Sequence, residues 1–123
     1  MLGELQEAMD EVAFLTRIKE VMEAKVIRHT IYIGRKIKKV AVCGGSGSFL
    51  LNDAISAGAD IFITADFKYH QFFDADGHIL IADMGHYESE HFTTEIFHHI
   101  LTKKFSTFAV VFSKINTNPV NYL

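Results

Sequence analysis

Three short apolar segments, at residues 37–45, 60–65 and 78–83, constrain the fold of this chain more than any other feature. Each is followed by a turn and then by a segment with helical or turn character. Short apolar runs bounded by turns are typical of buried strands. Strands that alternate with helices predict an α/β domain whose mixed sheet is largely parallel in its later part and is flanked by helices.

The segments around these strands complete the predicted order. Helical spacing over residues 5–25 indicates one broken helix or two, with Asp10 in a position to cap the second. The other predicted elements are a strand at 26–34, a helix at 49–59 ending near Gly58, a short helix at 66–77 closed by Gly77, a helix from about His86 to Lys104, a final strand at 106–114 and an irregular tail.

The composition indicates a single domain with more apolar side chains than its own core is expected to bury. The chain has 123 residues, 49% of them hydrophobic and 11 of them Phe, so part of this apolar surface is expected to be buried against another domain or subunit. No apolar run approaches the roughly 18–20 residues that span a bilayer, and the segment MLGELQEAMDEV lacks a cleavable signal pattern. We therefore expect no membrane association and a cytoplasmic location.

The net charge bears on nucleic-acid binding, and the cysteine content bears on disulfides and the redox compartment. The net charge is −3, and the one basic cluster, Arg35, Lys36, Lys38 and Lys39, brackets a turn, so a solvated turn is favoured over nucleic-acid binding. The single cysteine, Cys43, excludes an internal disulfide and fits a reducing compartment. Without a Cys/His/Asn arrangement, a small buried residue is the favoured interpretation of Cys43 over a nucleophile.

A glycine-rich loop follows the strand at 37–45. Its sequence, GGSGSF from Gly44 to Phe49, precedes a predicted helix, and this order can cradle an anion on backbone N–H groups. The loop matches neither the dinucleotide-binding nor the P-loop glycine pattern, so a plain tight turn explains it equally well.

The segment ILIADMGHYESE, residues 79–90, joins a predicted buried strand to a helix that contains His86 and Glu90. These residues are four apart, so their side chains leave the same face of a helix. On a helical wheel of about 100° per residue, both fall within the apolar arc, while His91, Glu95, His98 and His99 fall outside it. Because a carboxylate on an inward face costs several kcal/mol unless it is paired, Glu90 is predicted to bind a metal or a buried polar group.

A second pair, Asp66 and His70, has the same spacing and follows the preceding strand. Adjacent parallel strands would bring both pairs to one edge of the sheet, where sites of open α/β sheets lie. Structural alternatives remain for every member. His86 and Glu90 could form a capping pair at a helix start, Asp66 could be an N-cap, and His70 could be a half-buried ring bonded to backbone.

Several motifs taken together resemble the YbgI-like dinuclear-metal family, whose members are often described as homologues of a type 2 GTP cyclohydrolase I. They are, in order, VAVCGGSGS (40–48), TADFKYH (64–70), ADMGHYESE (82–90) and NTNP (116–119). The resemblance covers most of the chain and is strongest from Val40 to Glu90. The family's usual T-G-D reads Thr64-Ala65-Asp66 here.

The resemblance implies two α/β halves related by duplication, with two divalent metal ions (Zn, Mn or Fe) in the cleft between them. It makes His86 and Glu90 metal ligands and places Asp66 and His70 in a second motif that faces the same cleft. The remaining ligands, a paired-histidine motif and an aspartate, belong to an amino-terminal half. Neither occurs in this chain, and His98-His99 lies on the predicted outward face, so residues 1–123 are expected to be the carboxy-terminal domain alone.

The leading hypothesis is therefore half of the metal site of a hydrolase-like protein, with Asp66 or His70 as proton carrier or orienting residue. The glycine loop suggests a nucleotide or phosphate-bearing substrate, although no residue pattern identifies a purine-binding pocket. The alternative is a non-catalytic metal-binding scaffold that forms ring-shaped homo-oligomers, which the resemblance also implies. Alone, the chain is expected to bind metal weakly or not at all and to be inactive.

Overall fold

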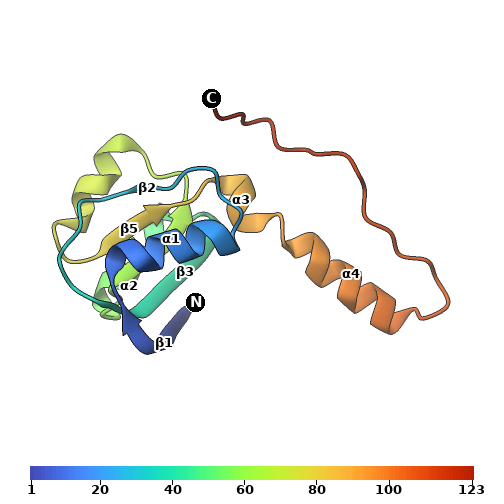
Figure 1. The fold of residues 1–123 in the computed structure, drawn as a ribbon, viewed down its shortest axis with the longest axis horizontal. Helices are drawn as coiled ribbons and strands as arrows, with labels where there is room; N and C mark the ends of the chain where they lie inside the picture. Colours follow the sequence, from blue (N-terminus) through green and yellow to red (C-terminus); the bar gives the residue numbers. More distant parts are fainter. The chain divides into compact units, whose positions relative to one another are not determined.

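A five-stranded sheet lies at the centre of the first part of the chain (Figure 1). The computed structural model describes residues 1–123, which divide into two compact units, Met1–Ser89 and Glu90–Leu123. The strands lie in the order β1-β3-β4-β5-β2. Their bounds are Leu2–Met9 for β1, Arg28–His29 for β2, Ile37–Ser46 for β3, Ile61–Ala65 for β4 and Leu80–Asp83 for β5.

The three central strands are parallel and both edge strands are antiparallel. β3 pairs with β4 and β4 pairs with β5 in parallel, whereas β1 and β2 run antiparallel to β3 and β5. Every residue of β4 and β5 is buried, as expected for parallel strands covered on both faces. The predicted α/β fold with a mixed, largely parallel sheet is confirmed.

Helical segments cover both faces of this sheet. Helix α1 (Glu11–Val21) crosses one face and packs Phe14 and Leu15 into the first core cluster (Figure 1). The 3-10 helix η1 (Ser48–Leu50), helix α2 (Leu51–Ser56) and the 3-10 helix η2 (Tyr69–Ala75) follow along the chain. The second core cluster joins sheet residues to α2 and η2; its members are Ala41, Leu51, Ala54, Ala59, Phe62, Phe67, Ala75, Ile79 and Ile81.

Two helix ends follow their sequence signals. Asp10 accepts hydrogen bonds from the amides of Val12 (2.9 Å) and Ala13 (3.4 Å), which confirms it as the N-cap of α1. Gly58 has a φ of +69° after α2, and the amides of Gly58 and Ala59 donate back to the last carbonyls of the helix, so Gly58 is the predicted C′ residue.

The helix predicted to start at residue 5 is wrong in its first part, because residues 2–9 form β1. Leu5 and Met9 are both half-buried against the first core cluster. Residues four apart share a side in a strand as well as in a helix, so this spacing fits both structures. Pairing with β3 decides in favour of the strand.

The strand predicted at 26–34 contracts to the two residues of β2. The reason lies in the buried carboxylate of Glu11, which accepts hydrogen bonds from the amides of Ile33 (2.8 Å) and Gly34 (3.0 Å). These two amides are therefore bonded to a side chain and not to a neighbouring strand. His29 of β2 is exposed.

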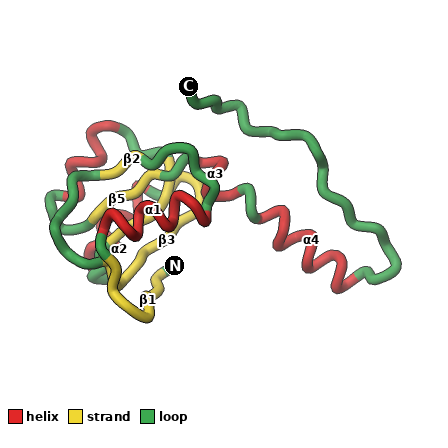
Figure 2. The backbone as a smooth tube through the Cα atoms, viewed as in Figure 1, coloured by secondary structure: helices red, strands yellow, loops and turns green.

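The second unit contains one long helix and an irregular tail (Figure 2). The helix predicted from His86 to Lys104 is interrupted, since α3 (His86–Glu90) and α4 (Thr93–Lys104) are separate. The strand predicted at 106–114 is wrong: this segment is irregular and almost wholly exposed. A strand requires a hydrogen-bonded neighbour, and the second unit contains no other strand.

Three cations of the basic cluster at residues 35–39, which was predicted to be a solvated turn, donate hydrogen bonds to backbone carbonyls. Arg35 donates to the carbonyl of His78 (2.7 Å), Lys38 Nζ to that of Gln6 (2.7 Å) and Lys39 Nζ to that of Ala57 (2.6 Å). These cations therefore stabilise the edge of the sheet at which β3 begins. No helix of the structure has the length and apolar character that crossing a membrane requires.

We predict that Asp10→Ala lowers the free energy of unfolding by about 1 kcal/mol, because α1 loses the acceptor for its first amides. Urea unfolding followed by circular dichroism measures this loss. Asp74→Ala is the control, since Asp74 is exposed, and it should change stability by less than about 0.5 kcal/mol. Equal effects of the two substitutions would contradict the capping role.

Candidate functional site

The carboxyl ends of β4 and β5 bring the two sequence-predicted motifs together. In the parallel register, Thr64 pairs with Asp83, so the residues that follow each strand leave the sheet at the same edge. Asp66 comes two residues after Thr64, and His86 comes three residues after Asp83. The expectation that neighbouring parallel strands would bring these motifs to one edge is confirmed for Asp66 and His86.

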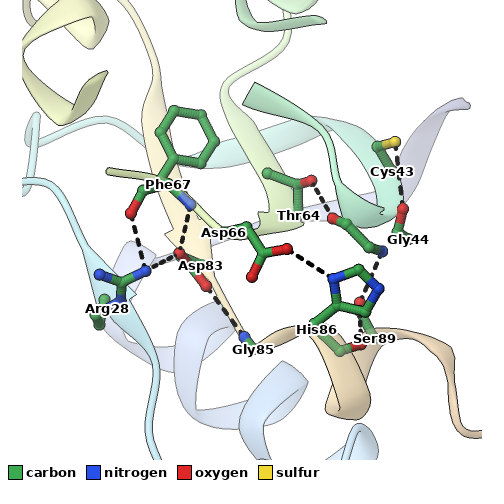
Figure 3. Close-up of polar contacts among 11 residues, drawn as sticks. Arg28, Cys43, Gly44, Thr64, Asp66, Phe67, Asp83, Gly85, His86 and Ser89 are labelled. Carbon is green, nitrogen blue, oxygen red and sulfur yellow. Dashed lines mark hydrogen bonds and ion pairs between the residues drawn. The ribbon is translucent and has the colours of Figure 1, made fainter. Parts of the chain in front are cut away.

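A buried carboxylate fixes the backbone of this edge (Figure 3). Asp83 is 3% exposed and accepts hydrogen bonds from the amides of Phe67 (2.9 Å) and Gly85 (3.1 Å). Arg28 of β2 forms an ion pair with the same carboxylate and also donates to the carbonyl of Phe67 (3.0 Å). One side chain thus holds the turns after β4 and β5, together with edge strand β2.

Asp66 and His86 form a close side-chain pair (Figure 3). His86 Nδ1 lies 2.6 Å from Asp66 Oδ2, and about half of each side chain is exposed. An ionised carboxylate only accepts hydrogen bonds, so Nδ1 is the donor. In a neutral imidazole with its proton on Nδ1, the lone pair that can bind a metal is on Nε2.

The backbone of Asp66 is held in an uncommon conformation. Its φ is +61°, in the left-handed region that non-glycine residues enter at a cost but that Asp and Asn tolerate best. This conformation excludes the alternative that Asp66 is a helix N-cap, and Lys68 takes that position in η2. Residues in such conformations concentrate at functional sites.

His70 lies apart from this pair. It is exposed in η2, with its ring centroid 5.1 Å from that of Tyr69, and the contacts of the structure do not join it to Asp66 or His86. The alternative of a half-buried ring bonded to backbone also fails for His70, because the ring is exposed.

The predicted inward orientation of the helix face with His86 and Glu90 is wrong in this chain. His86 and Glu90 are exposed, and the apolar side chains of α4 from the same arc are exposed as well. The buried acid of α3 is Glu88, which is 7% exposed. Glu90 ends α3 and is the first residue of the second unit.

The glycine-rich loop is packed tightly against Ser89 of α3 and against Thr64 of β4. The amide of Gly45 donates to Ser89 Oγ (2.9 Å), and Thr64 Oγ1 donates to the carbonyl of Gly45 (3.0 Å). A Cβ at Gly47 would overlap Thr64 Oγ1 and lie 2.9 Å from Cys43 Cβ. The tight-turn interpretation therefore accounts for these glycines. Cys43 itself is half-buried, slightly more open than expected.

Sequence reasoning missed the residues that organise the site. From the sequence, Asp83 is only the last residue of a predicted buried strand, and Arg28 is one residue of the strand predicted at 26–34. A signal for Asp83 existed: an acid at the end of a wholly apolar run must find donors, because burial without them costs several kcal/mol. Nothing in the sequence identified Arg28 as its partner, since the two are 55 positions apart.

Comparison with known proteins identifies the family of this chain. Residues 1–119 match the family Duf34/NIF3 (NGG1p interacting factor 3). The chain belongs to the Duf34/NIF3 family. A curated relative, the "GTP cyclohydrolase 1 type 2 homolog" of Staphylococcus aureus (strain MSSA476), is 33% identical over 128 residues, which include 100% of this chain and 35% of the relative.

Solved structures agree with this family membership. The crystal structure of a Staphylococcus aureus protein superposes on 99% of this chain and 41% of its own with a TM-score of 0.90 and 31% identity. The protein ybgI, described as of unknown function, has the same fold at a TM-score of 0.75 and 21% identity, covering 83% of this chain and 42% of its own. The YbgI-like resemblance is thus confirmed. The chain spans about a third of the length of the curated Duf34/NIF3 relative.

We predict that Asp83→Asn lowers the free energy of unfolding of this Duf34/NIF3 chain by about 2–4 kcal/mol, because the substitution removes a buried, charged acceptor and leaves Arg28 without its partner. Chemical denaturation measures the loss. The exposed acid Asp74 supplies the control, Asp74→Asn. A change below about 0.5 kcal/mol in Asp83→Asn would show that the edge does not depend on this carboxylate.

A second prediction concerns the glycine loop. Gly47→Ala is expected to cost about 1–3 kcal/mol of stability, because the added methyl group must displace Thr64 or Cys43. Gly3→Ala serves as the control, since nothing lies within 4 Å of a Cβ at Gly3. Thermal unfolding of both variants compares them, and equal midpoints would refute the close packing.

Proposed function

We propose that this chain supplies part of a dinuclear metal site in a hydrolase-like protein. His86 and Glu90 are its ligands, and Asp66 orients His86. The observation that carries the proposal is the 2.6 Å contact between His86 Nδ1 and Asp66. Histidines that bind metals in proteins characteristically donate their other ring N–H to a carboxylate or carbonyl, which fixes the tautomer and the direction of the ring.

The donors of α3 suit the proposed metals but are too few to hold one. Imidazole nitrogen and carboxylate oxygen are ligands of Zn, Mn and Fe. However, the structure contains no group of three or more His, Cys, Asp or Glu side chains that could hold a metal ion. The proposal therefore requires further ligands from an amino-terminal half, in keeping with the chain's share of about a third of its curated relative.

In such a site the metal ions would polarise the substrate and lower the pKa of a bound water. The residues of this chain would position the metal ligand His86 rather than react with the substrate. The Asp66 carboxylate keeps the proton of His86 on Nδ1, and the Asp83 carboxylate holds the turn that carries Asp66 by binding the next amide, that of Phe67. His70, exposed in η2, is proposed only as a proton carrier.

The substrate is proposed to carry a phosphate or nucleotide group, as the loop before α2 first suggested. One amide of this loop, that of Gly45, already donates to Ser89 Oγ within the protein. Phosphomonoesters and GTP represent this substrate class in the turnover assay described below.

A second candidate function is a non-catalytic metal-binding scaffold that forms homo-oligomers, and the exposed apolar side chains of the second unit are consistent with such an assembly. Ile96, Phe97 and Ile100 of α4 are 51–64% exposed, and Phe108 and Phe112 of the tail are 70% and 51% exposed. Contiguous exposed apolar side chains mark interaction surfaces. An amino-terminal half or another copy of the chain in a homo-oligomer would bury them.

We predict that metal binding depends on the Asp66–His86 pair. In zinc titrations by calorimetry, this chain alone should bind weakly, His86→Ala should abolish the binding, and Asp66→Asn should weaken it about 10–100-fold. Asn is chosen because it tolerates the left-handed backbone of position 66. The exposed pair of His78 and Asp76, 4.0 Å apart, provides the controls His78→Ala and Asp76→Asn. Tight stoichiometric binding by this chain, or equal losses in all four variants, would contradict the proposal.

Turnover separates the two candidate functions. A longer form of the protein that includes an amino-terminal half should be assayed with Zn, Mn or Fe against phosphomonoesters and GTP. Turnover that disappears in Glu90→Ala supports the hydrolase-like function. Metal uptake without turnover of any substrate supports the scaffold.

A further inference from the structure

A cavity of about 590 Å³ lies between η2 and the segment that begins with β2, within the first unit. Volumes of about 300–1,000 Å³ are typical of small-molecule sites. It forms where the sheet ends, because β2 has only two residues and η2 is a short 3-10 helix rather than a full crossover helix. No metal-type residue of the candidate site, neither Asp66 nor His86 nor Glu90, lines this cavity.

The walls of the cavity are mainly apolar and aromatic. Buried Ala75 and Ile79 and half-buried Ile33 and Phe72 contribute to the lining. Around them lie side chains that are unusually open to solvent for their type; these are Ile31 at 85%, Tyr69 at 72% and Phe73 at 64% exposure. The aromatic rings are arranged edge to face, with Tyr69 and Phe73 centroids 5.4 Å apart. Such walls suit a flat apolar molecule.

Arg28 lines the cavity together with His29 and the exposed carboxylate of Asp76, and the position of its guanidinium is already fixed. Its Nη2 donates to Asp83 and to the carbonyl of Phe67, and its guanidinium lies 5.5 Å from the ring centroid of Phe72. Nε and Nη1 are not used in these bonds, and 55% of the side chain is exposed. A guanidinium has five N–H donors, so an ordered arginine of this kind can bind a second anion with little further loss of entropy.

We propose that this cavity is a binding site for a flat, apolar small molecule that carries one carboxylate or similar anionic group. The ring system lies against Phe72 and Phe73, and the anionic end faces Arg28. This site is separate from the proposed metal site. It does not depend on the second unit, because its lining residues fall within residues 28–79.

The probe is 2-naphthoate, compared with 2-naphthalenemethanol, which has the same ring system without the charge. Titrations followed by ¹⁵N amide NMR should move the amides of Thr30, Ile31, Phe73 and Gly77. The carboxylate should bind roughly tenfold more tightly than the alcohol, as expected for one charge-assisted hydrogen bond.

The variant Phe73→Glu places a negative charge in the cavity and should weaken naphthoate binding at least about tenfold. Ile100→Glu is the matched control, because it adds the same charge to an exposed apolar position of α4, and it should leave binding unchanged. If Phe73→Glu fails to fold, Ile31→Glu replaces it, since Ile31 is more exposed.

Three results would overturn the proposal. The first is equal affinity for the carboxylate and the alcohol, which would remove the role of Arg28. The second is equal weakening in Phe73→Glu and Ile100→Glu, which would indicate nonspecific adsorption. The third is self-association of the chain, measured by light scattering, that is lost in Phe73→Glu. That result would show that this face is an interface between copies of the chain.

Discussion

The buried carboxylate of Asp83 determines the geometry of the functional edge of this domain. It ends a wholly buried strand, and it must be satisfied there because an unpaired buried carboxylate would cost several kcal/mol. Two backbone amides and Arg28 satisfy it, and each of the three belongs to a different segment. The turn after β4, the turn after β5 and edge strand β2 are therefore held by a single side chain, and Asp66 and His86 are brought together as a consequence.

The two proposed sites share this support but use it differently. At the carboxyl edge, the amide bonds to Asp83 hold the turns that carry Asp66 and His86. At the β2 edge, the ion pair immobilises Arg28, which then lines the cavity next to η2. The exposed apolar residues of the second unit are a separate feature. They fit a chain that spans about a third of its curated Duf34/NIF3 relative and that is proposed to pack against a further half.

The sequence predicted the fold where the local pattern and the tertiary structure agree. The runs at 60–65 and 78–83 are mainly apolar and form β4 and β5, and the adjacency of these strands places Asp66 beside His86. Predictions failed where long-range pairing decides. The spacing of Leu5 and Met9 fits a helix or a strand, and the segment 106–114 has strand-forming residues but no neighbouring strand in the second unit. Beyond β2, the amide of Ile33 is bound by Glu11, which lies 22 residues away in the sequence. Arg28 gave no local signal because its role exists only in the folded state.

We propose that Asp66 holds His86 with its proton on Nδ1, the form in which Nε2 can bind a metal. Long-range ¹H–¹⁵N NMR on the histidine-labelled chain reports which ring nitrogen carries the proton. We predict that the neutral imidazole of His86 carries its proton on Nδ1, and that Asp66→Asn weakens this preference. A neutral His86 with its proton on Nε2 in the unsubstituted chain would show that Asp66 does not fix the tautomer.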